Sequence, residues 1–233
     1  MLNFQKLFAV KPVIGMLHLG GTNPLGQAID DYDIYQAEGL DAVIIENYHG
    51  TVENVEDFIA RAPLSSWNMK IGVNVLGDFE LSFSLADRYG ADFIQIDSVQ
   101  PPDIDVELYC HCRKEYPNLV VLGGIGFKYT TNPEDNLKSW LGFGRLETDA
   151  IVTTGKGTGK ETPLEKLIEY KRVLGEFPLI EGAGSNAQTV YEHLSVADGV
   201  IVGSYFKIGG NTQLPVERKL VRTYMKEANR VRS

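Results

Sequence analysis

Eight short apolar segments, each followed by a turn and then by a helical pattern, limit most strongly how this chain can fold. The segments are rich in Val and Ile and are apolar at successive positions, which is typical of strands covered on both faces. We predict eight strands, over Pro12–Leu17, Asp41–Ile45, Lys70–Val75, Asp92–Ile96, Leu119–Leu122, Asp149–Val152, Phe177–Ile180 and Asp198–Val202.

Helical patterns fill the intervals between these segments. Gly39, Gly90 and Gly175 follow predicted helix ends, where a left-handed residue is favoured. The predicted helices span Gly26–Glu38, Thr51–Arg61, Glu80–Tyr89, Val106–Tyr116, Pro133–Phe143, Pro163–Gly175, Ala187–Leu194 and Pro215–Val231.

A strand–helix unit repeated eight times predicts an α/β fold, a (β/α)8 TIM barrel. A chain of 233 residues suits one such barrel, and no linker or low-complexity tract divides it, so we expect one domain over residues 1–233. An open doubly wound sheet is the alternative. The first strand lacks the Gly-x-Gly-x-x-Gly turn of that fold, which favours the barrel.

Composition narrows the class of partner. A net charge of −9 argues against nucleic acid or an anionic membrane. No apolar run is long enough to cross a bilayer, so we expect a soluble, cytoplasmic protein. Cys110 and Cys112 are one residue apart, which is not a standard zinc spacing, and we expect ordinary thiols. A homo-oligomer is plausible for such barrels, although no interface can be identified.

Glycines in the last two strand-end loops indicate a phosphate site. Loops after strands seven and eight hold phosphate in many barrels, and glycine lets backbone N–H groups approach an anion. The segment after strand seven is also predicted to open a helix, whose N-terminus would favour an anion. Tight turns alone are the alternative reading. The predicted phosphate-binding residues are Gly182, Gly184, Ser185, Gly203 and Ser204.

The loop after strand six, Gly155 to Thr162, contains two lysines among glycines. It is not a P-loop, because Thr154 stands where the first glycine is needed and Glu161 follows Lys160. We interpret it as a mobile, cationic loop that could close over an anionic substrate; a solvated glycine loop is the alternative.

Polar residues at other strand ends are candidates for catalysis. Glu46 and Asp97 could serve as general acid and base, because a barrel mouth can hold two carboxylates in unequal environments. Asn74 lies near the end of the third segment and joins this set. Lys128 or Lys156 could stabilise negative charge, and Lys128 could alternatively form a Schiff base.

His18, Asn47 and Thr154 are predicted to bind substrate. For any one of these polar residues, a hydrogen bond within a loop is the alternative role. His193 is expected to be structural and far from the mouth. No cofactor is predicted, although one variant of the hypothesis places a divalent metal on His18, Glu46 and Asp97, with His49 as a further ligand.

Several segments resemble the BtpA/SgcQ family. The resemblance covers most of the chain outside residues 78–131, and it is carried by Val13-Ile14-Gly15-Met16-Leu17-His18, Asp41-Ala42-Val43-Ile44-Ile45-Glu46-Asn47, Gly72-Val73-Asn74-Val75-Leu76, Asp149-Ala150-Ile151-Val152-Thr153-Thr154-Gly155, Ala197-Asp198-Gly199-Val200-Ile201-Val202-Gly203-Ser204 and Lys207-Ile208-Gly209-Gly210.

The resemblance implies a barrel of the ribulose-phosphate-binding type. It also implies a family named for photosystem I biogenesis in some members and for a sugar-uptake gene cluster in others. Three departures put the family's substrate in doubt here: Gly20 to Gly26 replace a proline-rich loop, Gln95-Ile96-Asp97 replaces Arg-x-Asn, and strand five keeps only Lys128 of an Asp…Lys-His pattern.

Two functions from different classes follow. The first is an enzyme that isomerises, cleaves or transfers a group on a small phosphorylated metabolite, such as a sugar phosphate or nucleotide-like compound. The second is a non-catalytic assembly or biogenesis factor that uses the barrel as a binding platform. Loss of the cellular role on substitution of Glu46 and Asp97 would favour the enzyme.

Overall fold

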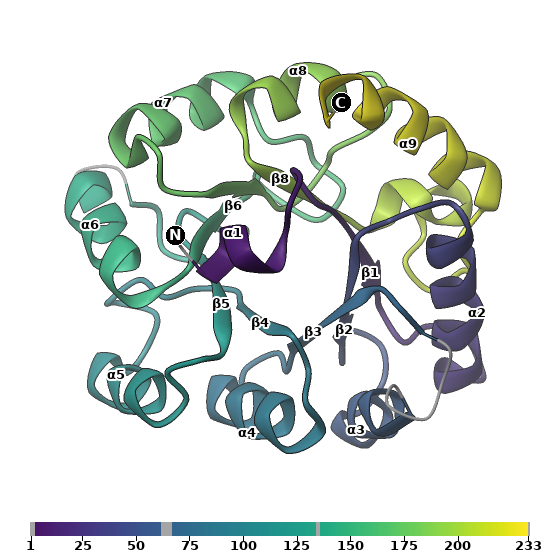
Figure 1. Cartoon of the computed structure of the whole chain (residues 1–233), viewed down its shortest axis with the longest axis horizontal. Helices are drawn as coiled ribbons and strands as arrows, with labels where there is room; N and C mark the ends of the chain where they lie inside the picture. Colours follow the sequence, from purple (N-terminus) through teal and green to yellow (C-terminus); the bar gives the residue numbers. More distant parts are fainter. Residues whose placement is uncertain (1–2, 62–66, 134–135, 233) are drawn as a thin grey trace.

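The structure is a computed structural model that describes residues 3–61, 67–133 and 136–232. Parallel strands pair in chain order, and the last pairs with the first, so the sheet closes into a barrel (Figure 1). The predicted TIM barrel is confirmed, and an open sheet is excluded. The strands are β1 (Val13–Leu17), β2 (Ala42–Glu46), β3 (Lys70–Asn74), β4 (Phe93–Ile96), β5 (Val120–Gly124), β6 (Ala150–Thr153), β7 (Leu179–Glu181) and β8 (Gly199–Val202).

Helices surround the barrel as a ring, and a short helix lies across its centre in this view (Figure 1). They are α1 (Asn3–Leu7), α2 (Pro24–Ala37), α3 (Val52–Arg61), α4 (Phe79–Tyr89), α5 (Val106–Glu115), α6 (Leu137–Glu147), α7 (Leu164–Leu174), α8 (Val190–Val196), the 3-10 helices η3 (Ser204–Phe206) and η4 (Ile208–Gly210), and α9 (Arg218–Arg232).

Both faces of the sheet are buried, as the continuous apolar runs predicted. In β1, Ile14 and Met16 join the cluster inside the barrel, whereas Val13 and Leu17 pack against the helices. The inner cluster is the smaller of the two. It fills the interior below the strand ends, so the space available to a ligand lies at the mouth.

Four aspartates precede even-numbered strands, and each clamps the strand before it. Their carboxylates accept hydrogen bonds of 2.8–2.9 Å from backbone N–H groups, pairing Asp41 with Val13, Asp92 with Ile71, Asp149 with Val121 and Asp198 with Leu179. Each aspartate also meets a cation: Arg232, Lys70, Arg113 and Lys171 respectively. The sequence prediction started these strands at the aspartates, one residue too early.

The bottom of the barrel is closed by α1, which the sequence prediction missed. Phe4 and Phe8 belong to the inner cluster, and the ring centroid of Phe8 lies 5.9 Å from that of Phe93. Five residues form too short a helix to show a clear periodicity. Because α1 covers this end, the mouth at the C-terminal ends of the strands is the open end of the barrel.

Three predicted helix starts differ from the structure by three or four residues, and the others lie within two. The sixth helix begins at Leu137 rather than Pro133, and residues 134 and 135 lie outside the described residues. Helix α8 begins at Val190 rather than Ala187. The last helix begins at Arg218, because the preceding segment first forms an isolated antiparallel bridge between Lys207 and Val216.

Candidate active site

His18 and Glu46 follow β1 and end β2, and they face one another at the mouth of the barrel. His18 Nε2 lies 3.7 Å from Glu46 Oε1. Both side chains are buried, and the His18 imidazole packs against the end of β8, since a Cβ on Gly203 would lie 2.8 Å from His18 Cε1. The sequence placed both residues at the mouth, and the structure brings them together.

Burial sets the protonation of this pair. Burial raises the pKa of Glu46 to about 8, with the negative charge of Asp97 adding to the rise and Lys128 opposing it. Burial also holds the pKa of His18 well below its usual value, and the charge of Lys207 contributes. At neutral pH Glu46 is therefore mostly a protonated acid beside a neutral imidazole.

Asp97 and Asn74 pair at the ends of β4 and β3. Asp97 Oδ1 accepts hydrogen bonds from Asn74 Nδ2 at 2.9 Å and from Gln95 Nε2 at 3.0 Å. Both hydrogen bonds are accepted by Oδ1, and Oδ2 accepts no hydrogen bond from the described residues. Gln95 lines the mouth, whereas Asn74 and Asp97 line an adjoining cavity of about 280 Å³ between β3 and β4.

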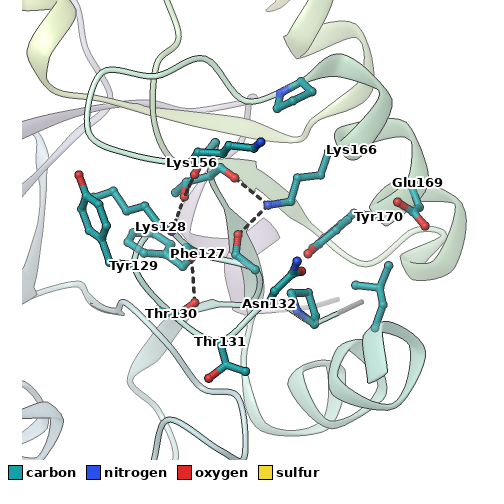
Figure 2. Close-up of a pocket in the computed structure, with 16 residues that line it drawn as sticks. Phe127, Lys128, Tyr129, Thr130, Thr131, Asn132, Lys156, Lys166, Glu169 and Tyr170 are labelled. Carbon is teal, nitrogen blue, oxygen red and sulfur yellow. Dashed lines mark hydrogen bonds between the residues drawn. The ribbon is translucent and has the colours of Figure 1, made fainter. Parts of the chain in front are cut away.

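The two candidate lysines occupy different places. Lys128 lines the mouth together with His18 and Glu46. Lys156 is exposed and lines a separate cavity between the loops after β5 and β6, in which Lys128 also takes part (Figure 2). The structure therefore keeps Lys128 beside Glu46 and places Lys156 in a cavity that Glu46 does not line.

The loops after β6, β7 and β8 enclose a cavity of about 570 Å³ beside the mouth. Three predicted phosphate residues line it, namely Gly184, Ser185 and Ser204, and Gly184 and Ser204 also line the mouth. Gly182 and Gly203 line the mouth only. The cavity and the mouth therefore adjoin. One ligand could occupy both.

Unpaired backbone donors gather at this cavity. Among the described residues, the backbone N–H groups of Gly184, Ser185, Asn186 and Ser204 donate no hydrogen bond to the protein. Backbone amides are obligatory donors, and several directed at one place form an anion-binding nest. These donors belong to the two loops that the sequence predicted to bind phosphate. The prediction that a helix begins at Ala187 was wrong, because α8 begins at Val190, so the donors belong to the loop.

The Ser185 side chain does not face a ligand, because its hydroxyl lies 2.7 Å from the hydroxyl of Tyr224 and is buried. Two predicted substrate-binding residues are likewise engaged within the protein. Asn47 Oδ1 accepts a hydrogen bond from the backbone N–H of Leu76, and Thr154 Oγ1 accepts one from that of Lys128. These contacts match the alternative role as loop-fixing groups.

The loop after β6 packs closely on the loop after β7. Gly184 has φ +78°, and a Cβ there would lie 2.2 Å from the Lys160 carbonyl oxygen. Thr162 Oγ1 donates to the Ala183 carbonyl at 3.0 Å. This packing brings Thr158 and Gly159 over the mouth, where they line both the mouth and the cavity between the loops after β6, β7 and β8.

The geometry gives the metal alternative no support. Across residues 3–61, 67–133 and 136–232, no three His, Cys, Asp or Glu side chains come together to hold a metal ion. His18, Glu46 and Asp97 therefore do not form such a set, and His49 bonds instead to Thr212 and Gln213. Cys112 is buried, Cys110 is half-buried, and both are free thiols.

Other residues at or beside the site escaped the sequence prediction. Thr212 and Asn211 follow η4 and line the cavity between the loops after β6, β7 and β8. Lys207 is buried and pairs with Asp31, 176 residues earlier, which ties this segment to α2. His193 is hydrogen-bonded at 2.8 Å to Glu181, the last residue of β7, so it is closer to the strand ends than predicted. Only the tertiary fold reveals these pairings.

Comparison with known proteins finds a family whose profile matches this chain and relatives that align with most of its length. A sequence profile of the BtpA family matches residues 131–230. An uncharacterised mitochondrial protein of Caenorhabditis elegans is 36% identical over 93% of this chain and 92% of its own. An uncharacterised protein of Pyrococcus horikoshii is 31% identical over 91% and 94%. The photosystem I biogenesis protein BtpA of Synechocystis is 25% identical over 89% and 84%.

Solved structures with the same fold include enzymes. N-(5'-phosphoribosyl)anthranilate isomerase from Pyrococcus furiosus has a TM-score of 0.65 at 18% identity, covering 94% of this chain and 99% of its own. Thiamine phosphate pyrophosphorylase from the same organism has a TM-score of 0.65 at 14% identity, covering 95% and 96%. In the part of the chain that the structure describes, no helix is long and apolar enough to span a membrane.

Proposed function

Because the chain belongs to the BtpA family and folds as a closed (β/α)8 barrel, we propose that it is an enzyme acting on a small phosphorylated metabolite. The single observation that carries this proposal is the group of unpaired backbone N–H donors at Gly184, Ser185, Asn186 and Ser204. The reaction is of the isomerase, lyase or glycosyl-transfer type.

The phosphate binds in the cavity between the loops after β6, β7 and β8. Backbone amides supply hydrogen bonds to its oxygens, and Lys160, which lines the same cavity, supplies positive charge. Glycine at position 184 lets the chain adopt φ +78° and approach the loop after β6 closely. A site of this kind binds a phosphate despite the net charge of −9, because its charges and dipoles are local.

The reacting part of the substrate lies at the mouth. Glu46, which keeps its proton at neutral pH, donates that proton to a substrate oxygen or carbon. Asp97, in the adjoining cavity that Gln95 shares with the mouth, accepts a proton on Oδ2, while Asn74 and Gln95 hold Oδ1 in place. Lys128, which lines the mouth, stabilises negative charge that develops on the substrate.

The names of the structural neighbours agree with this class of substrate. Both are enzymes whose names include a phosphorylated compound. Their identity to this chain is low, so they support the kind of ligand and not a particular reaction.

A thermal-shift panel tests the proposal. Sugar phosphates and nucleotides are compared with the same compounds lacking phosphate. A ligand present at about a hundred times its Kd stabilises the folded state by about 2.7 kcal/mol, which raises the melting temperature measurably. We expect stabilisation by at least one phosphorylated compound and none by its unphosphorylated counterpart. No stabilisation by any compound, or by concentrated inorganic phosphate, would contradict the proposal.

A non-catalytic assembly factor is the second candidate, favoured by the name of the Synechocystis relative. Glu46→Gln and Asp97→Asn separate the two candidates, because they remove proton transfer while changing shape little. If both variants fold and fully sustain the protein's cellular role, the barrel is a binding platform and catalysis is the wrong interpretation.

A further inference from the structure

A second cavity, of about 510 Å³, opens between the loops after β5 and β6 and the start of α7. It is separate from the phosphate cavity, with which it shares no lining residue. Figure 2 shows side chains from all three segments around it. The proposed function so far assigns no role to this cavity.

Positive charge dominates its lining. Lys128, Lys156 and Lys166 line the cavity, against a single carboxylate, Glu169. Within the described residues, neither Lys128 nor Lys156 forms an ion pair. Three lysines facing one acid on a chain whose net charge is −9 form a local attractive site for an anion.

Two buried polar groups in the wall of this cavity, on Lys166 and Tyr170, have hydrogen-bond donors without an acceptor among the described residues. The Lys166 ammonium donates to the carbonyl oxygens of Gly126 and Thr154, both at 2.7 Å. A lysine ammonium has three donors, so one hydrogen remains. The Tyr170 side chain is 2% exposed and its hydroxyl has no hydrogen-bond partner among the described residues. This oxygen lies in the wall of the cavity, where a Cβ on Gly126 would come within 2.1 Å of it, and Figure 2 shows the side chain among the lining residues.

An unpaired buried hydroxyl costs free energy unless a ligand or water satisfies it. Burial raises the pKa of Tyr170 to about 12, so the group is a neutral donor. Burial also lowers the pKa of Lys166 to about 8, which leaves it largely charged at neutral pH. Both groups therefore offer hydrogen to an acceptor, which is what an oxyanion supplies.

Lys128 connects this cavity to the mouth. Among the described residues, Lys128 and Phe127 are the two that line both spaces. The Lys128 ammonium lies 4.6 Å from the centre of the Phe127 ring. The mouth therefore adjoins the phosphate cavity on one side and the lysine-lined cavity on the other.

We propose that the cavity between the loops after β5 and β6 binds a second acidic group of the substrate, so that the substrate is anionic at both ends. This inference rests on the proposed function and deepens it. The second group is a carboxylate or a phosphate, because both present oxygens to Lys156, Lys166 and Tyr170. Phe127, Pro133 and Leu137 give the cavity an apolar side for the carbon skeleton.

Tungstate, a tetrahedral dianion close to phosphate in size, tests the two sites independently. Bound tungstate is counted by equilibrium dialysis of the full chain and located by anomalous diffraction. We expect two ions per chain, one beside Gly184 and Ser204 and one in the cavity between the loops after β5 and β6. Lys156→Ala should remove the second ion and keep the first. Lys219→Ala, which removes an exposed charge on α9, is the matched control and should keep both.

The outcomes separate the two proposals. Tungstate only beside Gly184 and Ser204 overturns the second site and leaves the proposed function standing. Tungstate only in the cavity between the loops after β5 and β6 overturns the phosphate site, while an absence at both overturns both. Tyr170→Phe gives a second check, because it should weaken only the second ion, by about tenfold.

Calorimetry with a matched hexose series identifies the acidic group. Glucose 6-phosphate carries one phosphate, 6-phosphogluconate adds a carboxylate, and glucose 1,6-bisphosphate adds a phosphate. We expect one of the two-headed compounds to bind at least about tenfold more tightly than glucose 6-phosphate. Lys156→Ala should abolish that advantage. Equal affinities for all three, or an equal loss for all three in the variant, would overturn the inference.

Discussion

Glu46 shows how burial at one residue prepares the chemistry of the mouth. The carboxyl makes no hydrogen bond among the described residues and lies 3.7 Å from a neutral imidazole. Water, which would stabilise its charged form, is largely excluded, so the pKa of Glu46 rises to about 8. A carboxylic acid that is protonated near neutral pH is suited to donate a proton.

Glu46→Gln should change how stability depends on pH. Since the pKa of Glu46 is higher in the folded state than in the unfolded state, the folded protein binds the extra proton between about pH 4.5 and 8. Stability on account of this group is therefore greatest at low pH and falls as the pH rises through that range. Glutamine, which resembles the protonated acid, removes this loss.

Urea unfolding at about pH 5.5 and about pH 7.5 measures the effect. On going from the lower to the higher pH, the free energy of unfolding of Glu46→Gln should rise relative to that of the native protein by on the order of 2 kcal/mol. Glu165→Gln, at an exposed position on α7, is the matched control and should gain little. An identical pH dependence in the native protein and Glu46→Gln would contradict the assignment. Activity should fall by about a hundredfold or more in Glu46→Gln.

At the scale of elements, the loops after β6 and β7 form one unit. Gly184 lies against the backbone of Lys160 and Glu161 with φ +78°. This contact holds Thr158 and Gly159 over the mouth, beside the unpaired amides. Phosphate affinity should therefore depend on how closely the two loops approach.

Gly184→Ala should separate the loops and weaken phosphate binding by about tenfold or more, because its Cβ would lie 2.2 Å from a backbone oxygen. Gly39→Ala has the matching strain, with φ +81°, but its Cβ meets nothing within 4 Å. Gly39→Ala should lower the free energy of unfolding by about 1 kcal/mol and leave the affinity for phosphate unchanged. Calorimetry with inorganic phosphate compares them, and equal affinities in the two variants would count against the loop contact.

The aspartate clamps act at the opposite end of the strands and serve stability. Asp149 is buried, accepts from the Val121 N–H and pairs with Arg113 at 3.2 Å. Asp149→Ala should cost about 2–4 kcal/mol in the free energy of unfolding, since it leaves a buried donor and a cation unsatisfied.

Asp149→Asn keeps an acceptor for Val121 and should cost roughly half as much. Chemical denaturation measures both variants. Phosphate affinity should stay within about twofold of the native value in each, because the clamp lies far from the mouth. A loss of affinity as large as that of Gly184→Ala would show that the two ends of the barrel are coupled.

The sequence predicted these elements unevenly. Continuous Val- and Ile-rich runs identified every strand, because both faces are buried. The loops of Gly184 and Gly203 were predicted to bind phosphate because they follow strands seven and eight. By contrast, the pairing of Lys207 with Asp31 and the open hydroxyl of Tyr170 depend on residues far apart in the chain. Local patterns carry no trace of such contacts.

At the scale of the molecule, the barrel separates stability from function. Helix α1 and the aspartate clamps close one end, while the unpaired amides, Glu46 and the lysine-lined cavity gather at the other. The inner apolar cluster lies between them and includes Phe4 and Phe8 of the N-terminal segment. Closure of the bottom leaves the mouth as the place where a ligand can enter.

Phe8→Ala should destabilise the whole barrel by about 3–5 kcal/mol, since it leaves a void against Phe93 and Phe4. Phe8→Leu should cost less than half of that. Urea unfolding measures both, and phosphate affinity of the folded variants should be unchanged. A loss below about 1 kcal/mol in Phe8→Ala would mean that α1 does not close the core.

Phosphate binding by backbone amides is the central claim, and nuclear magnetic resonance of ¹⁵N-labelled protein tests it most directly. On titration with inorganic phosphate, the amide signals of Gly184, Ser185, Asn186 and Ser204 should shift together in a saturable way. Signals from the aspartate clamps should stay in place. Unmoved signals at these four residues, or shifts confined to other parts of the chain, would contradict the account.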